Sequence, residues 1–173
     1  MKKLSILCLA AALSFSALTA EFGVGVFTST DGLNNGIQTG IGATYENEYL
    51  FGTLGYSTGS GEDKRDGTGA KDKPNTSGFS VSAAYKLPLS AENTALFGVR
   101  YTSLTGEVAT DTAGSESDLT ASKLALTAGV KTALNSSVSL LAEVDVYSTT
   151  TTEVETAANV KSTDATGSNF LNG

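Results

Sequence analysis

Six charged side chains stand at alternate positions in segments that otherwise mix apolar and small residues. They are Lys86, Arg100, Lys123, Lys131, Glu143 and Asp145. Charges that a strand turns toward a protein interior must pair with one another or meet water. Residues of these types could therefore form a structural salt-bridge network that fills an interior, or line a narrow pore that selects ions. Their spacing alone does not decide between the two.

Catalytic and metal chemistry have little support. The chain has no His, and its single Cys lies at position 8, so Ser-His-Asp and Cys-His arrangements are excluded. Glu143 and Asp145 could act as an acid–base pair, but the neighbouring Arg and Lys favour a structural network. A loop over residues 62–73 carries acidic oxygens suited to Ca²⁺, yet basic residues separate them and the spacing matches neither an EF-hand nor a Gly-Asp nonapeptide repeat. We predict no enzyme activity, no metal and no cofactor.

The first twenty residues have the features of a secretory signal peptide. Lys2 and Lys3 are followed by an apolar run over residues 4–13, which is too short to span a bilayer, and Ala20 offers a small residue for cleavage. We expect export through the Sec pathway and a mature domain over residues 21–173. Cleavage removes two of the 11 basic residues and none of the 18 acidic ones, so the formal charge changes from −7 to −9. Such an acidic chain is a poor partner for nucleic acid.

The mature chain alternates between apolar and polar or small residues, which predicts β-strands. Residues 119–147 show this best: an apolar set ending in Val144 and Val146 alternates with Glu143, Asp145 and Tyr147. Short polar turns at 46–48, 90–93 and 135–137 separate these strands from longer polar connections at 29–36, 59–78, 110–118 and 150–167. The strict alternation of short and long connections predicts an antiparallel up-and-down meander.

With its leader, its opening F-G-V-G-V-F over residues 22–27 and its alternating turn lengths, the chain resembles the small eight-stranded outer-membrane β-barrels. These are the OmpA transmembrane domain, OmpX and the opacity-type surface proteins. The resemblance implies a transmembrane β-barrel in a Gram-negative outer membrane, with the apolar face toward lipid. Members of this family end in a strand whose last residue is aromatic, whereas this chain ends Phe170-Leu-Asn-Gly173. We therefore expect the last strand to be truncated or incomplete.

Three functions remain open at this point. The leading hypothesis is a structural and surface-interaction protein, adhesin-like, that is anchored in outer-membrane lipid and meets host or cell-surface ligands through its loops. The alternative is a porin-like channel for small solutes, with the six charges as pore lining. The third is a soluble, secreted, lipocalin-like carrier, in which the apolar face would point inward around a hydrophobic ligand.

Overall fold

The computed structural model describes residues 20–29, 37–60, 75–109, 116–155 and 161–172. The secondary structure of these residues consists of eight β-strands. They are β1 (Glu21–Ser29), β2 (Ile37–Glu46), β3 (Leu50–Ser60), β4 (Asn75–Pro88), β5 (Asn93–Ala109), β6 (Glu116–Ala133), β7 (Ser139–Glu155) and β8 (Lys161–Asn172). Within the described part of the chain, no helix has the length and apolar character needed to span a membrane.

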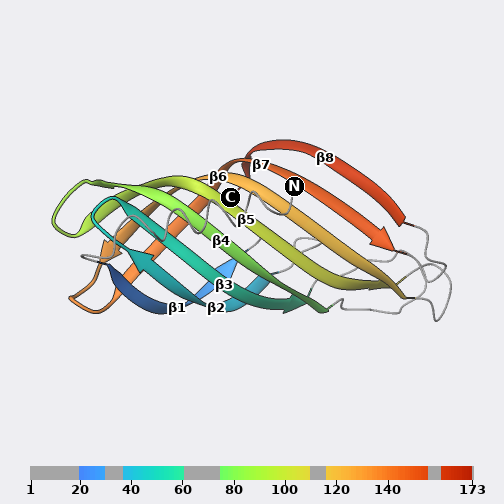
Figure 1. The fold of residues 1–173 in the computed structure, drawn as a ribbon, viewed down its shortest axis with the longest axis horizontal. Helices are drawn as coiled ribbons and strands as arrows, with labels where there is room; N and C mark the ends of the chain where they lie inside the picture. The colour runs from blue at the N-terminus through green and yellow to red at the C-terminus, as the bar shows by residue number, and fades with distance from the viewer. Residues whose placement is uncertain (1–19, 30–36, 61–74, 110–115, 156–160, 173) are drawn as a thin grey trace.

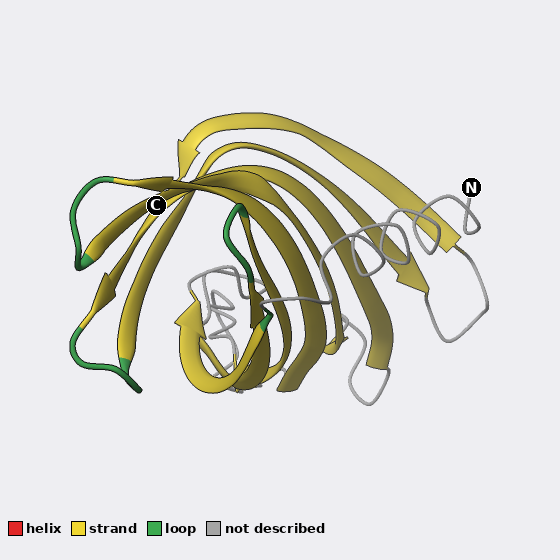
Figure 2. Cartoon of the chain, turned by 60° about the vertical axis from the view of Figure 1, so that its left-hand side comes forward, coloured by secondary structure: helices red, strands yellow, loops and turns green. Residues whose placement is uncertain are grey.

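The strands form one sheet in which each strand pairs antiparallel with the next, in the order β1 to β8 (Figure 1). The sheet is strongly curved rather than flat (Figure 2). The predicted antiparallel meander is therefore confirmed. Among the described residues, β1 pairs only with β2 and β8 only with β7, so the sheet is not closed.

The last strand differs from the prediction in where it begins. We predicted a loop from 150 to 167, but β7 continues to Glu155 and β8 begins at Lys161. The stretch has few apolar residues, so its sequence gives no alternating signal, and backbone pairing with β7 makes it a strand. Its pairing with β7 runs from Asp145 to Glu155.

The three short turns share one hydrogen-bond pattern, in which a side-chain oxygen at the first position accepts from two backbone N–H groups. Asn47 Oδ1 accepts from the backbone of residues 49 and 50 at 2.9 and 2.7 Å. Ser90 Oγ accepts from residues 92 and 93 at 3.3 and 3.0 Å, and Asn135 Oδ1 accepts from residues 137 and 138 at 2.8 and 2.9 Å. Each turn also has a backbone bond from its first residue to the residue three positions later. These local contacts fix where each hairpin reverses.

The two faces of the sheet differ sharply. The inward face carries the buried side chains, among them Leu96, Phe51 and Asp145. The outward face carries large apolar side chains that are exposed, with Phe22 78%, Val24 93% and Val26 86% accessible. A lipocalin-like carrier would need the reverse arrangement, because its apolar face must enclose the ligand. The exposed apolar face instead suits contact with lipid.

On the outward face, every strand from β1 to β7 changes from a large aliphatic or aromatic side chain to Ser or Thr between two successive outward positions. The pairs are Val26/Thr28, Ile41/Thr39, Tyr56/Thr58, Phe79/Ser77, Tyr101/Ser103, Leu124/Ser122 and Tyr147/Thr149. We call this line the outer border. On β7 about ten residues separate the short turn from the border, which at a tilt of about 40° gives about 25 Å. That is the height of the apolar band of an outer-membrane barrel.

A bulge in β7 corrects one prediction. Leu126 pairs with Tyr147 but the next residue, Thr127, pairs with Asp145, so Val146 is an extra residue in β7. We predicted Tyr147 on the polar face beside Asp145, and Val146 on the apolar face. The extra residue shifts the alternation by one, which keeps Asp145 inward and turns Tyr147 outward, where it is 39% exposed.

Candidate functional site

All six charged residues singled out by the sequence lie on the inward face, in two groups. The upper ion cluster consists of Arg100, Lys123, Glu143 and Asp145 from β5, β6 and β7. The lower ion cluster consists of Lys86 and Lys131, from β4 and β6, together with Glu46 from the end of β2. The predicted set is thus divided between two sites. The lower ion cluster lies beside the short turns, and the upper ion cluster lies farther from these turns along β5, β6 and β7.

Asp145 is the centre of the upper ion cluster. Its carboxylate contacts Arg100 Nη2 through Oδ1 and Lys123 Nζ through Oδ2, the latter at 2.5 Å. Arg100 Nη1 also donates to Glu143 Oε1 at 3.3 Å. The Asp145 side chain is only 2% exposed, whereas those of Arg100 and Lys123 are 20% and 18% exposed. A buried carboxylate between two cations satisfies the requirement that interior charges be paired.

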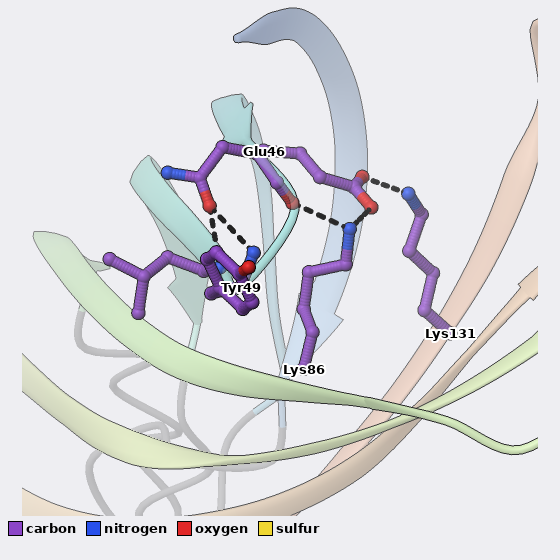
Figure 3. Close-up of polar contacts among 6 residues, drawn as sticks. Glu46, Tyr49, Lys86 and Lys131 are labelled. Atoms are coloured by element: carbon purple, nitrogen blue, oxygen red, sulfur yellow. Dashed lines mark hydrogen bonds and ion pairs between the residues drawn. The ribbon is translucent and has the colours of Figure 1, made fainter. Parts of the chain in front are cut away.

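Glu46 organises the lower ion cluster (Figure 3). Its carboxylate contacts Lys86 Nζ at 2.5 Å through Oε1 and Lys131 Nζ through Oε2. Lys86 Nζ also donates to the backbone oxygen of Asn47 at 2.7 Å, and Lys131 Nζ lies 5.5 Å from the centre of the Phe51 ring. Because β2, β4 and β6 are not neighbours in the sheet, these contacts cross its concave side. They tie the β2–β3 turn to the far half of the sheet.

Glu46 is a member of the lower ion cluster that the sequence analysis missed. We placed Glu46 in the first short polar turn, at 46–48. The structure continues β2 to Glu46 and begins the turn at Asn47. The alternation of β2 could have revealed it. Glu46 lies an even number of residues from Gln38 and Gly42, which face inward, so it belongs to the same face of the strand.

Apolar side chains flank the upper ion cluster on the inward face. Phe51, Ala84 and Leu96 form a buried group on the side of the short turns, where Leu96 is 1% exposed. A second set of buried residues lies on the opposite side of Arg100 along the strands: Leu104, Leu119 and Ala121. The charged layer is therefore bounded by apolar side chains in both directions along β5.

A buried polar group that the sequence did not reveal lies near the loop end of β2, β3 and β4. Gln38, which is 2% exposed, donates from Nε2 to Thr76 Oγ1 at 3.1 Å. Its Oε1 accepts from Ser57 Oγ at 2.5 Å. A single amide thus bridges its neighbour β3 and the next strand, β4. Only the register, which sequence does not supply, brings these three residues together.

Glycines make the inward wall thin on β2 and β3, and Phe27 from β1 fills part of the space. A Cβ atom built on Gly40 would lie 2.6 Å from Phe27 Cζ, and one on Gly55 would lie 2.7 Å from Phe27 Cε1. The Phe27 ring therefore packs directly on the backbone of these two glycines. Side chains at either position would displace it.

The structure offers no support for a metal site in the described residues. They contain no group of three or more His, Cys, Asp or Glu side chains placed to hold an ion. The acidic loop at 62–73 lies outside the described residues. Glu143 and Asp145 both contact Arg100, an arrangement that suits charge pairing better than proton transfer.

A meander of tilted strands with an apolar exposed face, a polar paired interior and short turns at one end defines the class of transmembrane β-barrels. The chain belongs to the outer membrane protein beta-barrel domain family, whose model matches residues 4–170. It is accordingly a protein of the outer membrane. It is also similar to the crystal structure of a major outer membrane protein from Thermus thermophilus at 19% identity, with a TM-score of 0.47, covering 84% of this chain and 83% of that one. No curated protein matches the chain.

Proposed function

We propose that this chain is an anchored surface-interaction protein, adhesin-like, whose barrel holds polar connections and a projecting wall outside the cell. The strands β5, β6 and β7 have 17, 18 and 17 residues, whereas β1, β2 and β3 have 9, 10 and 11. About 9–11 residues cross a membrane as a tilted strand. The residues of β5, β6 and β7 in excess of this crossing length extend one side of the barrel about 15 Å beyond the outer border.

The observation that favours this proposal over a channel is the close packing around the upper ion cluster. Asp145 is buried between Arg100 and Lys123, and Leu96 and Leu104, both nearly inaccessible, lie on either side of Arg100 along β5. The interior of an eight-stranded barrel is just wide enough for side chains to fill it. An ion would have to break the central pairs and pass the apolar residues in order to cross.

The second candidate is a small-solute channel, and one observation favours it. A Cβ atom built on Gly25, on the inward face of the edge strand β1, would meet nothing within 4 Å, so no described side chain fills the space beside this residue. If the open space continues past the upper ion cluster, Arg100, Lys123 and Glu143 would line it and select ions by charge.

Conductance separates the two functions. The full chain, inserted into a planar bilayer in concentrated KCl, is expected to give no regular current steps. Variants Arg100→Ala and Asp145→Ala serve as a positive comparison, because they remove the side chains that fill the interior. Regular steps from the unmodified chain, with an altered cation-to-anion ratio in Arg100→Ala, would move the assignment to a channel.

The surface-interaction function is tested by adherence. A Gram-negative host that displays the chain is compared with the same host displaying variants in which residues 61–74 or 110–115 are replaced by Gly-Ser linkers. Adherence to cultured animal cells should rise when the chain is displayed and fall when a connection is replaced. Equal adherence with and without the chain would overturn this function, provided that the heat-dependent gel mobility shows a folded barrel.

A further inference from the structure

The inward face of β1, β2 and β3 is rich in glycine, in contrast to the charged inward face of β5, β6 and β7. Its glycines include Gly23, Gly25, Gly40, Gly42 and Gly55. The register places Gly25 opposite Gly42 and Gly42 opposite Gly55, so these three follow one another across adjacent strands. Glycine has no side chain with which to occupy an interior. The upper ion cluster thus belongs to one half of the inward face, and the glycine-rich half needs a different side chain to close it.

The ring of Phe27, from β1, lies over this glycine-rich half. A Cβ atom built on Gly55 would lie 2.7 Å from Cε1 and 2.9 Å from Cζ of the ring, and one built on Gly40 would lie 2.6 Å from Cζ. The ring therefore extends from β1 across β2 to β3 and rests on the backbone of both strands. A larger residue at Gly55 would push the ring away, because the other atom close to its Cβ, Ser80 Oγ, is 3.2 Å distant.

Phe27 stands between the loop end of the strands and the space beside Gly25. Gly25 is the neighbouring inward residue of β1 on the side away from the connection at 30–36, and a Cβ atom built there would meet nothing within 4 Å. On the other side of the ring, toward the connections, Gln38 forms its hydrogen-bonded bridge to Ser57 and Thr76. A polar solute that enters from the loop end along β1 and β2 therefore meets the ring before it reaches Gly25.

A second apolar side chain approaches the same row of the sheet from the opposite side. Successive partners in the register of β1 to β5 are Phe27, Gly40, Ser57, Gly78 and Leu104. Leu104 is 4% exposed and lies over Gly78, where a built Cβ atom would be 2.6 Å from Leu104 Cδ2. Both large side chains thus lean over a glycine toward the middle of the row. An apolar constriction excludes ions and polar solutes, because they lose hydration there without gaining a polar partner.

We propose that Phe27 is an aromatic lid that closes the glycine-rich half of the interior to ions and polar solutes from the loop end. The upper ion cluster closes the half formed by β5, β6 and β7, and the ring closes the half formed by β1, β2 and β3. A small side chain in place of the ring connects the space beside Gly25 with solvent. This role concerns the interior alone, so it goes beyond the proposed surface function and does not depend on it.

The test is chemical access to a single introduced thiol. The full chain carries Cys8→Ser, which removes its one cysteine, and Gly25→Cys, where the structure leaves room for the side chain. The chain is folded in detergent, and its reaction with a cationic methanethiosulfonate reagent is followed by intact mass. The control chain carries Val26→Cys instead of Gly25→Cys. Val26 is next to the lid on the same strand but faces the detergent, so its thiol reacts faster only if β1 detaches.

Phe27→Ala should raise the reaction rate of the inward thiol about tenfold, because the apolar ring no longer excludes the reagent, whereas Phe27→Tyr keeps the ring and should leave the rate unchanged. Gly55→Ala should also raise the rate, since its Cβ displaces the ring, and should add nothing to Phe27→Ala.

Three results would overturn the lid. The first is a thiol that reacts as fast in the folded chain with Phe27 as in the unfolded chain, whatever the variants do. The second is an unchanged rate in Phe27→Ala or, should heat-dependent gel mobility show that this variant does not fold, in Gly55→Ala. The third is an equal increase at the control thiol, which would assign the effect to detachment of β1.

Discussion

Replacing Asp145 with Asn is the most direct test of how the interior is held together. The substitution keeps the size of the side chain and removes one negative charge from the centre of the upper ion cluster. Arg100 and Lys123 then lose the carboxylate that both contact, while Arg100 keeps its 3.3 Å hydrogen bond to Glu143.

The magnitude follows from burial. Breaking a buried ion pair by changing one partner costs about 3–5 kcal/mol of folding free energy. The Arg100 and Lys123 side chains keep 20% and 18% exposure, so water recovers part of the loss, and the Asn side chain still accepts a hydrogen bond. We expect Asp145→Asn to lower the free energy of unfolding by about 2–3 kcal/mol. Glu143→Gln weakens a longer contact to Arg100 and should cost about 1 kcal/mol.

Urea unfolding in phosphatidylcholine vesicles provides the assay. Because the chain contains no Trp, folded and unfolded fractions are best measured by heat-dependent gel mobility and far-ultraviolet circular dichroism. The double variant Lys123→Met with Asp145→Asn completes a double-mutant cycle, whose coupling energy should exceed about 1 kcal/mol. A loss below about 1 kcal/mol in Asp145→Asn, or an equal loss in Glu143→Gln, would refute the view that Asp145 is the centre of the cluster.

Three further predictions address the sheet, a turn and a titration. Gly98→Ala should destabilise the fold by about 1–3 kcal/mol in the same assay, because its Cβ would collide with the Ala83 backbone oxygen. Gly25→Ala, whose Cβ would meet nothing within 4 Å, should change stability by less than about 0.5 kcal/mol. Equal effects of the two substitutions would contradict the close packing around Gly98. Asn47→Ala should cost about 1–2 kcal/mol and more than Asn135→Ala, because the Asn47 side chain is buried and the Asn135 side chain is exposed. The reverse order would show that burial of the capping side chain does not matter. A hydrogen bond and a Coulombic interaction with Glu48 raise the pKa of Tyr49 above its ordinary value, so Glu48→Gln should lower the Tyr49 titration midpoint in nuclear magnetic resonance spectra, and an unchanged midpoint would remove Glu48 as the cause.

Much of the fold could be predicted because lipid makes one face of each strand apolar. Leu124 and Leu126, or Val24 and Val26, identify a strand and its outward face without any tertiary information. The short turns were found to within one residue, since polar breaks between alternating segments have few interpretations. The same reasoning failed at β8, where apolar residues are few and the strand exists through pairing with β7.

The site was less accessible to sequence reasoning. The alternation of side chains along each strand places Arg100 and Glu143 on one face of the sheet. Which charges come into contact depends on strand register and on the curvature of the sheet. Glu46 contacts Lys131 across three intervening strands, a relation that no local pattern encodes. The bulge at Val146 was hidden for a different reason: the residues on both sides of it continue an unbroken alternation.

The position of that bulge has a consequence for errors of strand alignment. Below it, Val144 and Asp145 cannot exchange faces without placing a carboxylate in lipid, so a one-residue slip is severely penalised. Above it, both faces of β7 carry hydroxyl side chains, such as Ser148 inward and Thr149 outward, and a slip changes little. The information that aligns β6 with β7 is therefore concentrated in the residues nearest the Asn135 turn. The rest of the hairpin contributes little to this alignment. It can accept an inserted or deleted residue while the membrane-embedded part keeps its register.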